Sequence, residues 1–324
     1  MSQYIIRRLV QAIPLLFAIS LLTFAIIEIA PGDAAQMYID PEKGTDPAYI
    51  EQVRVSLGLD QPFYVRYISW LGKTLTGDLG YSLRTRRPVS LEVGDRLPNT
   101  LILGASALLL SFVLAIPIGV ISAVKRNTAV DYGLSILALV GISIPIFWLA
   151  LLLLQVFSIQ LGWLPASGMR NMRQELTGFA GVIDVAHHMV LPVLVLSFAQ
   201  LASWSRYQRS ALIDVLGQDY IRTARSKGLA ERRVLTVHAL KNSLLPMITV
   251  AAISVPTIVM GAYITETIFS WPGIGRLGVT SVAGRDYPVI MAVTLLSALL
   301  IIGSNLFADI SYAWADPRIR YDSR

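Results

Sequence analysis

The chain has 324 residues, of which 54% are apolar and only 15% are charged, and its mean hydropathy is +0.60. Soluble domains are roughly 45–50% apolar and about 25% charged, so this composition excludes an ordinary soluble protein and indicates an integral membrane protein. With no cysteine there are no disulfides or thiolate metal sites, and the net charge of +6 fits cytoplasmic loops, since no nucleic-acid-reading module is visible.

Six apolar segments are each long enough to cross a hydrocarbon core, which needs about 20 helical residues. None of them contains Asp, Glu, Lys or Arg, and internal prolines indicate kinked helices packed in a bundle. The first segment follows Arg7 and Arg8 as a signal peptide would, but it is too long and no small-residue cleavage site follows it. We therefore predict an all-α, polytopic membrane protein. The six predicted spans are Leu9–Ile27, Asn99–Val124, Tyr132–Gln160, Val185–Ser203, Leu245–Thr265 and Tyr287–Ala308.

The segment between the first two predicted spans, residues 31–98, is too polar to cross a membrane and too long to be a simple turn. Proline and glycine punctuate it, and Ala48–Leu57 and Pro62–Leu75 have the pattern of two short helices. We expect a small extracytoplasmic subdomain here. The chain is then predicted to divide into an N-terminal transmembrane helix (1–30), the extracytoplasmic segment (31–98), a five-helix core (99–312) and a cytoplasmic tail (313–324).

Basic residues predict the orientation, because Lys and Arg concentrate in short loops on the cytoplasmic side. The N-terminal arginine pair, the Lys125-Arg126 turn, the loop at 206–241 and the tail together hold 15 of the 27 Lys and Arg residues. Both termini are therefore predicted to lie in the cytoplasm.

The most informative segment is the basic stretch from Asp219 to Pro246. Eight Lys and Arg residues lie between Arg206 and Lys241, against three acidic residues, which makes this the densest cationic loop in the chain. From charge alone, a solvated loop that only fixes topology is the simpler interpretation. Its roughly helical sequence between two long apolar runs is also typical of a surface that docks a soluble partner.

Several blocks of the chain carry motifs. In the loop they are Arg222-Thr223-Ala224-Arg225-Ser226-Lys227-Gly228, His238, Asn242 and Leu245-Pro246. Elsewhere they are Gly77-Asp78-Leu79-Gly80, Pro88-Val89, Pro98-Asn99-Thr100-Leu101, Glu266-Thr267-Ile268-Phe269-Ser270-Trp271-Pro272-Gly273 and Asp316-Pro317-Arg318-Ile319-Arg320. Together these motifs, spread over nearly the whole chain, resemble the inner-membrane permease subunits of binding-protein-dependent ABC importers, of the dipeptide, oligopeptide and nickel type. The general importer signature has Glu-Ala-Ala where this loop has Arg-Thr-Ala, and this departure is similar to the peptide branch of the family.

The resemblance implies a type I ABC importer permease fold in a bacterial or archaeal cytoplasmic membrane. It implies a second homologous permease, two cytoplasmic ATPase subunits and an extracytoplasmic solute-binding protein as partners, a peptide as substrate, and no nucleic acid. The chain would be a transporter subunit and not an enzyme. It would hold no cofactor, because ATP and Mg would be bound by the ATPase subunits, and no Walker A sequence occurs in it.

Residues 206–244, hereafter the coupling loop, would then act as a lever that converts motion of the ATPase into helix movement. Basic side chains would supply charge-assisted contacts to the ATPase. Thr223 and Ala224 would allow its close approach, and Gly228 would adopt the positive φ that ends the helix. The predicted ATPase-coupling residues are Tyr220, Arg222, Thr223, Ala224, Arg225, Lys227, Gly228 and His238.

The transport path is predicted only by residue type, since a wide and mildly selective cavity suits apolar and neutral polar side chains. Glu28 and Glu266 lie near the outer ends of the first and fifth predicted spans, where ionisable groups are functional candidates. A carboxylate facing water at the membrane interface is the simpler account of both. The candidate gate and pathway residues are Glu266, Trp148, Gln155 and Gln200.

Two local signals are discounted. The sequence Gly273 to Gly278 fits the G-x-G-x-x-G pattern of dinucleotide sites, but no strand precedes it, so it is interpreted as a turn. His187 and His188 suggest a metal site, but adjacent residues on a helix do not face the same way and no third clustered ligand is evident. We expect no metal in this chain.

Other functions remain open. Gly104-Ala105-Ser106-Ala107 resembles the Gly-x-Ser element of intramembrane serine proteases, but a histidine partner is poorly placed and small residues are common where membrane helices touch. A membrane scaffold or receptor without transport would be functional alone. Within the importer interpretation, glutathione, nickel complexes or another small solute are the alternative substrates.

Overall fold

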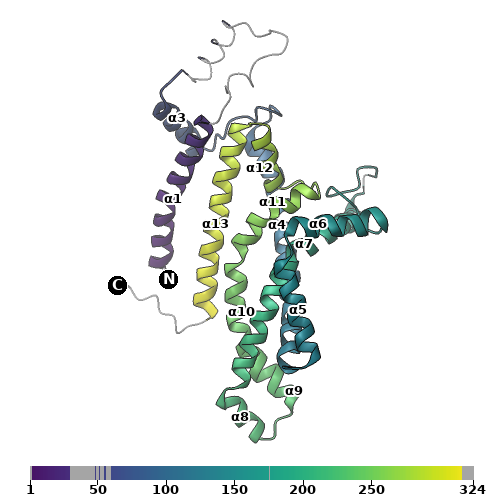
Figure 1. Ribbon diagram of the computed structural model, residues 1–324. Helices are drawn as coiled ribbons and strands as arrows, with labels where there is room; N and C mark the ends of the chain where they lie inside the picture. Colours follow the sequence, from purple (N-terminus) through teal and green to yellow (C-terminus); the bar gives the residue numbers. More distant parts are fainter. Residues whose placement is uncertain are drawn as a thin grey trace. The chain divides into compact units, whose positions relative to one another are not determined.

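The structure is a computed structural model that describes residues 2–29, 60–174 and 176–315, together with the single residues 48, 51 and 55. Throughout these residues the regular structure is helical (Figure 1), and the one strand-like feature there is an isolated bridge between Tyr81 and Pro88. The predicted all-α fold is confirmed for this part of the chain. The predicted helix Ala48–Leu57 lies largely outside the described residues, as does the motif at 316–320.

The chain divides into two compact units. The larger consists of Met1–Ile5, Pro98–Arg276 and Leu300–Arg324, and the smaller of Ile6–Leu97 and Leu277–Leu299. Two of the helical segments, η2 and η3, are π-helical. The helices follow one another as α1 (Ser2–Ile29), α3 (Phe63–Leu75), α4 (Val89–Val124), α5 (Ala129–Ser143), α6 (Ile146–Leu153), η2 (Leu154–Gln160), α7 (Gly178–Leu216), α8 (Asp219–Ser226), α9 (Glu231–Arg233), η3 (Val234–Leu240), α10 (Lys241–Ile253), α11 (Val255–Ile268), α12 (Ile274–Ala283) and α13 (Tyr287–Ala315).

Five described helices are long and apolar enough to cross a membrane, and a sixth span is obtained if the bent pair Ala129–Ser143 and Ile146–Gln160 counts as one. The third predicted span is therefore not a straight helix, because its two halves meet at 103°. The break falls at Ile144, which is extended with ψ 125°. It precedes Pro145, and the proline ring drives the preceding residue out of the α region.

The fifth predicted span, Leu245–Thr265, is wrong in its bounds. Helix α10 ends at Ile253 and α11 begins at Val255, with Pro256 in the first turn of α11. Proline lacks a backbone N–H and fits without loss only in the first turn of a helix, so Pro256 marks a new start. The long apolar helix is instead Glu231–Ala251, which begins inside the coupling loop.

In the smaller unit, aromatic side chains pack α3 against α1. The ring of Phe24 lies edge-on to the rings of Phe63 and Tyr67, with centroids 5.5 Å apart in both pairs. The Tyr67 hydroxyl is 2.8 Å from the Ser20 hydroxyl, within hydrogen-bond distance. The predicted amphipathic helix Pro62–Leu75 is thus confirmed as α3.

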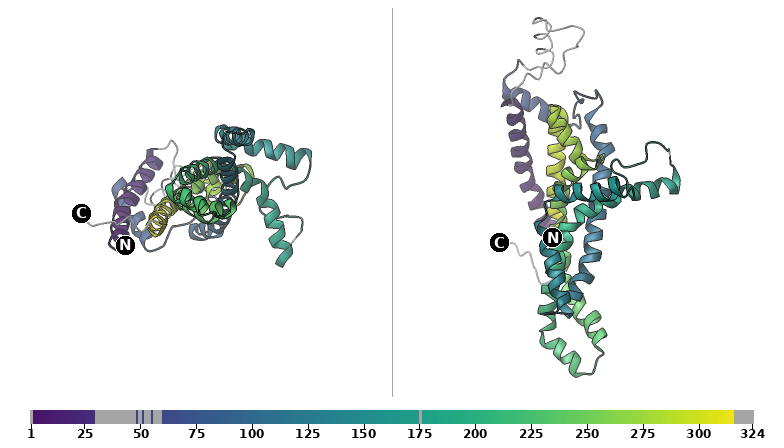
Figure 2. Two further views of the ribbon diagram at one scale, coloured as in Figure 1. Left: turned by 90° about the horizontal axis from the view of Figure 1, so that it is seen from below. Right: turned by 45° about the vertical axis from the view of Figure 1, so that its right-hand side comes forward.

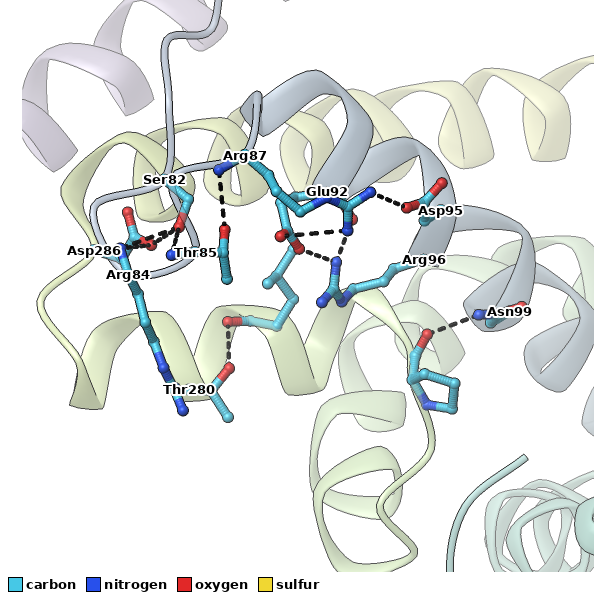
Figure 3. A network of polar contacts seen from close by, with 12 residues as sticks. Ser82, Arg84, Thr85, Arg87, Glu92, Asp95, Arg96, Asn99, Thr280 and Asp286 are labelled. Carbon is cyan, nitrogen blue, oxygen red and sulfur yellow. Dashed lines mark hydrogen bonds and ion pairs between the residues drawn. The ribbon is translucent and has the colours of Figure 1, made fainter. Parts of the chain in front are cut away.

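The loop after α3 is joined to the start of α13 by buried polar groups (Figure 3). Asp286 is buried and accepts hydrogen bonds from the Ser82 hydroxyl at 2.5 Å and from a backbone N–H of the same loop at 3.0 Å. Glu92, in the first turn of α4, is also buried and forms ion pairs with Arg87 and Arg96. The hydrogen bonds of Asp286 and the ion pairs of Glu92 offset the cost of burying these two carboxylates.

In the larger unit, α5 and α10 pack along the long helix α7 (Figures 1 and 2). Helix α4 contacts α7 at Gly119, where a Cβ atom would lie only 2.7 Å from the carbonyl oxygen of Ser205 and from the Cβ of Gln208. Small residues at such points let membrane helices approach closely. Glycine is therefore required at 119 for this contact.

Replacing Gly119 by alanine is expected to force α4 and α7 apart, because one of the overlapping atoms is backbone and cannot rotate away. Overpacking of this kind costs about 1–3 kcal/mol. Thermal unfolding of the detergent-purified protein should show the loss as a lower midpoint. Gly133→Ala is the matched control, because a Cβ there meets nothing within 4 Å. Equal midpoints for the two variants would contradict the close contact.

Candidate functional site

Helices α8 and α9 and the π-helical η3 form one end of the larger unit (Figures 1 and 2). In α8, Ile221 and Ala224 are 0% and 7% exposed, and they are three residues apart, so they lie on one face of the helix. That face contacts η3 and joins an apolar cluster that also contains residues of α4 and α7. The resulting apolar cluster, hereafter the loop core, consists of Ala123, Leu212, Ile221, Ala224, Val234 and Ala239. The coupling loop is therefore a packed element and not a loose connection.

Helix α8 ends in a Schellman motif, as the predicted role of Gly228 requires. Gly228 has φ +72° and donates its N–H to the carbonyl of Arg225 at 2.9 Å, while the N–H of Leu229 donates to the carbonyl of Ala224 at 3.4 Å. Leu229 also packs against the loop core. These two hydrogen bonds and the apolar contact define the motif, and the left-handed position is one that glycine adopts readily. The predicted positive φ is confirmed.

A two-point ion pair closes α8 onto α9. Arg225 donates from Nη2 to one oxygen of Glu231 at 2.6 Å and from Nε to the other at 3.1 Å. The hydrogen bonds to Glu231 raise the pKa of the Arg225 guanidinium above its usual value. Both side chains are exposed to solvent, which screens their attraction, so the pair contributes little to stability. Arg225, predicted to contact the ATPase, thus has a partner inside the loop.

The outward face of α8 is polar. Tyr220, Thr223 and Lys227 are exposed and spaced three and four residues apart, which makes them neighbours on the helix surface. Arg222 is exposed as well, and His238 in η3 is half-buried. Ala224, predicted to allow close approach of a partner, is instead turned into the loop core. We call Tyr220, Thr223 and Lys227 the α8 strip; its contact with an ATPase stays a prediction.

Glu266 is fully buried, with 0% of its surface exposed, so its interpretation as a carboxylate facing water is wrong. One oxygen accepts the Thr100 hydroxyl at 2.7 Å, and the other accepts the N–H of Arg276 at 3.0 Å. A Cβ at Gly273 would overlap the carboxyl group. The side chain therefore pins the turn after α11 to the adjacent part of α4.

Neighbouring contacts bring two of the motif blocks together. The indole N–H of Trp271 donates to the carbonyl of Asn99 at 3.0 Å, and the Asn99 amide donates to the carbonyl of Pro272 at 2.8 Å. The hydroxyl of Thr100 also accepts the N–H of Ile274 at 2.8 Å. The blocks at 98–101 and 266–273 thus form one hydrogen-bonded junction.

The other candidate pathway residues are scattered. Trp148 in α6 and Gln155 in η2 are exposed, and Gln200 in α7 is half-buried. Glu28, the other interfacial carboxylate, forms an ion pair with Arg66 of α3. The pathway residues stay a prediction.

A buried polar cluster at the base of the coupling loop was missed by sequence reasoning. Asp131 in the first turn of α5 pairs with Arg209 of α7. Sequence reasoning assigned no role to Asp131, and Arg209 was one of the eight basic residues of the loop. Gln208, next to Arg209, is completely buried and donates to the Ser243 hydroxyl of α10 at 2.9 Å. The available signal was a single carboxylate at the start of a long apolar run, where ionisable groups are functional candidates.

Residues 115–321 match the family described as binding-protein-dependent transport system inner membrane component. Residues 1–104 match the family that describes the N-terminal part of such membrane components. The oligopeptide transport system permease protein AppB of Bacillus subtilis (strain 168) is 45% identical over 322 residues, which cover 99% of this chain and 100% of that protein. The di/tripeptide transport system permease protein DppB of Pseudomonas aeruginosa (strain UCBPP-PA14) is 42% identical over 335 residues, covering 99% of each.

Among solved structures, an inward facing conformation of the MetNI methionine ABC transporter contains a similar chain. The TM-score is 0.56 at 17% sequence identity, and the match covers 69% of this chain and 96% of that chain. At this identity the likeness concerns the fold alone. It agrees with the expected fold of an ABC importer permease.

Proposed function

Because this chain belongs to the family of binding-protein-dependent transport system inner membrane components, we propose that it is the permease subunit of an ATP-driven importer of di- or oligopeptides. The observation that carries the proposal is the 45% identity to an oligopeptide permease over 99% of the chain. A second permease would complete the path. ATP would be hydrolysed by two separate cytoplasmic subunits, and a solute-binding protein would deliver the peptide from outside.

The two different faces of helix α8 in the coupling loop support this assignment. The α8 strip offers a polar, exposed face to a partner, while the opposite face of α8 is locked into the loop core on α4 and α7. A partner that moved the strip would therefore move the ends of those two helices. If ATP binding by the partner favoured one arrangement of the helices, the path would open alternately to the two sides.

We propose that both termini and the coupling loop lie in the cytoplasm. The cationic excess of the loop supports this, since positive charge concentrates on that side. The arrangement places the α8 strip where ATP-hydrolysing subunits reside.

Reconstituted uptake tests the function. The chain would be purified with its second permease and ATPase subunits, inserted into liposomes, and given the binding protein with a radiolabelled dipeptide. Accumulation that requires both ATP and the binding protein is expected. Uptake of glutathione or a nickel complex in place of peptides would reassign the substrate, and ATP hydrolysis by this chain alone would overturn the assignment. A chain that is purified without partners and functions alone would favour the scaffold hypothesis.

The intramembrane protease hypothesis is not supported. His187 Nε2 lies 3.2 Å from the carbonyl oxygen of Trp163, and His188 Nδ1 lies 2.8 Å from that of Asp184. The two imidazoles are thus engaged near the start of α7, while Ser106 lies inside α4. The relatives are transport permeases.

A further inference from the structure

Asp131 is 1% exposed, although it lies in the first turn of a helix that follows a basic turn. Arg209 of α7 reaches it with two parallel hydrogen bonds, from Nε to Oδ1 at 2.6 Å and from Nη2 to Oδ2 at 2.7 Å. A planar guanidinium bound at two points to a carboxylate fixes orientation as well as distance. Helices α5 and α7 are therefore locked in one register at this level.

Two further donors complete the coordination of the carboxylate. The Ser122 hydroxyl of α4 donates to Oδ1 at 2.5 Å, and the N–H of Asn127, in the α4–α5 turn, donates to Oδ2 at 2.9 Å. One buried side chain thus ties together α4, the turn after it, α5 and α7. We call Asp131, Arg209, Ser122 and the Asn127 N–H the Asp131 clamp.

The clamp adjoins the loop core on both helices. Ser122 precedes Ala123, and Arg209 lies three residues before Leu212, and both of these apolar residues belong to the loop core. The outgoing arm of the loop is bound at the same level, because Gln208 donates to Ser243 of α10. The loop core therefore links α8 to the helix segments of α4 and α7 that the clamp holds together.

Stability alone is a poor reason for such an arrangement. Buried ion pairs often add no more stability than apolar side chains of the same volume, because removing two charges from water is costly. Their best-attested use is to fix one packing arrangement among several. The pair lies between the loop core and the apolar parts of α5 and α7. We therefore expect it to fix the register of α5 along α7.

We propose that the Asp131 clamp is a positioning element for energy coupling. It makes the α4–α5 turn, the end of α7 and the coupling loop move as one body, so that motion of the loop reaches α5 instead of being lost as slippage of α5 along α7. The inference rests on the proposed function, in which the coupling loop receives the motion of an ATPase.

The first test uses the complete transport complex in liposomes. In Asp131→Asn, the ratio of peptide taken up to ATP hydrolysed is expected to fall about tenfold, within the usual range of coupling effects, with complex assembly retained. Arg209→Lys keeps the charge but only one point of contact, so an intermediate loss is expected. Asp60→Asn removes an exposed carboxylate that is distant in the sequence from the clamp residues. It should leave the ratio of peptide uptake to ATP hydrolysis unchanged. An unaltered ratio in both clamp variants overturns the proposal.

The second test measures the rigid body directly and does not depend on the substrate. The chain contains no cysteine, so two spin labels can be attached to a variant with two introduced cysteines. These are Arg126→Cys in the α4–α5 turn and Ser226→Cys in α8, and both positions are exposed. In the otherwise unaltered complex, the distance between the two labels is expected to be the same with and without ATP. Asp131→Asn should broaden the distribution of that distance. A distance that changes with ATP in the unaltered complex overturns the clamp, whereas failure of peptide uptake alone would overturn only the proposed function.

Discussion

Replacing Gly228 by valine is expected to lower ATP-driven uptake, by at most about 30-fold, while the transmembrane helices remain folded. Gly228 has φ +72°, in the left-handed region, where an L-residue costs roughly 1–2 kcal/mol and a β-branched residue is a genuine outlier. A penalty of this size lowers the ratio of ordered to disordered loop by a factor of about 5–30. Because the Schellman motif holds Leu229 on the loop core, losing it frees the α8 strip from α4 and α7. Uptake and ATP hydrolysis in liposomes measure the effect.

Gly228→Asn is the matched control. Asparagine enters the left-handed region more readily than other residues with a side chain, so uptake near the wild-type level is expected. A Cβ at this position meets nothing within 4 Å inside the chain, so crowding within the chain does not explain a loss. Wild-type uptake in the valine variant, with the complex intact, would count against the loop as a lever.

The second large effect is expected at Glu266. Truncation to alanine removes the acceptor for the Thr100 hydroxyl and the Arg276 N–H, both in a buried site. Each buried donor left without a partner costs about 1–3 kcal/mol. We therefore expect Glu266→Ala to lower the thermal midpoint of the purified complex strongly, and to reduce the amount of complex in the membrane by loosening the turn after α11.

Glu266→Gln separates this role from that of a gate. The amide has nearly the same shape and keeps one acceptor oxygen, so an intermediate loss of stability is expected. Transport per folded complex should then stay close to wild type. If the glutamine variant instead keeps its midpoint and loses uptake, the carboxylate acts in the transport path and the structural assignment fails.

Several features could be predicted because they depend on local properties of the chain. Apolar runs of membrane length predict the all-α fold, and Gly228 after a polar segment predicts the end of a helix. Each of these features depends only on residues that are adjacent in the sequence. Prolines were harder to interpret. Pro117 and Pro192 lie inside long helices, whereas Pro145 and Pro256 coincide with breaks. Whether a proline ends a membrane helix depends on which neighbouring groups satisfy the freed carbonyls, and the sequence does not contain that information.

The sequence by itself determined the class of the protein, its apolar helices and the place of its densest cationic loop, because composition, run length and charge density belong to contiguous residues. Tertiary structure alone decided that Ala224 faces inward, that Glu266 is a buried pin, and that Asp131 meets Arg209, 78 residues away. The physical reason is that burial and pairing are set by which helix faces meet. The identity of an acidic residue does not show whether its carboxylate contacts water or a guanidinium group.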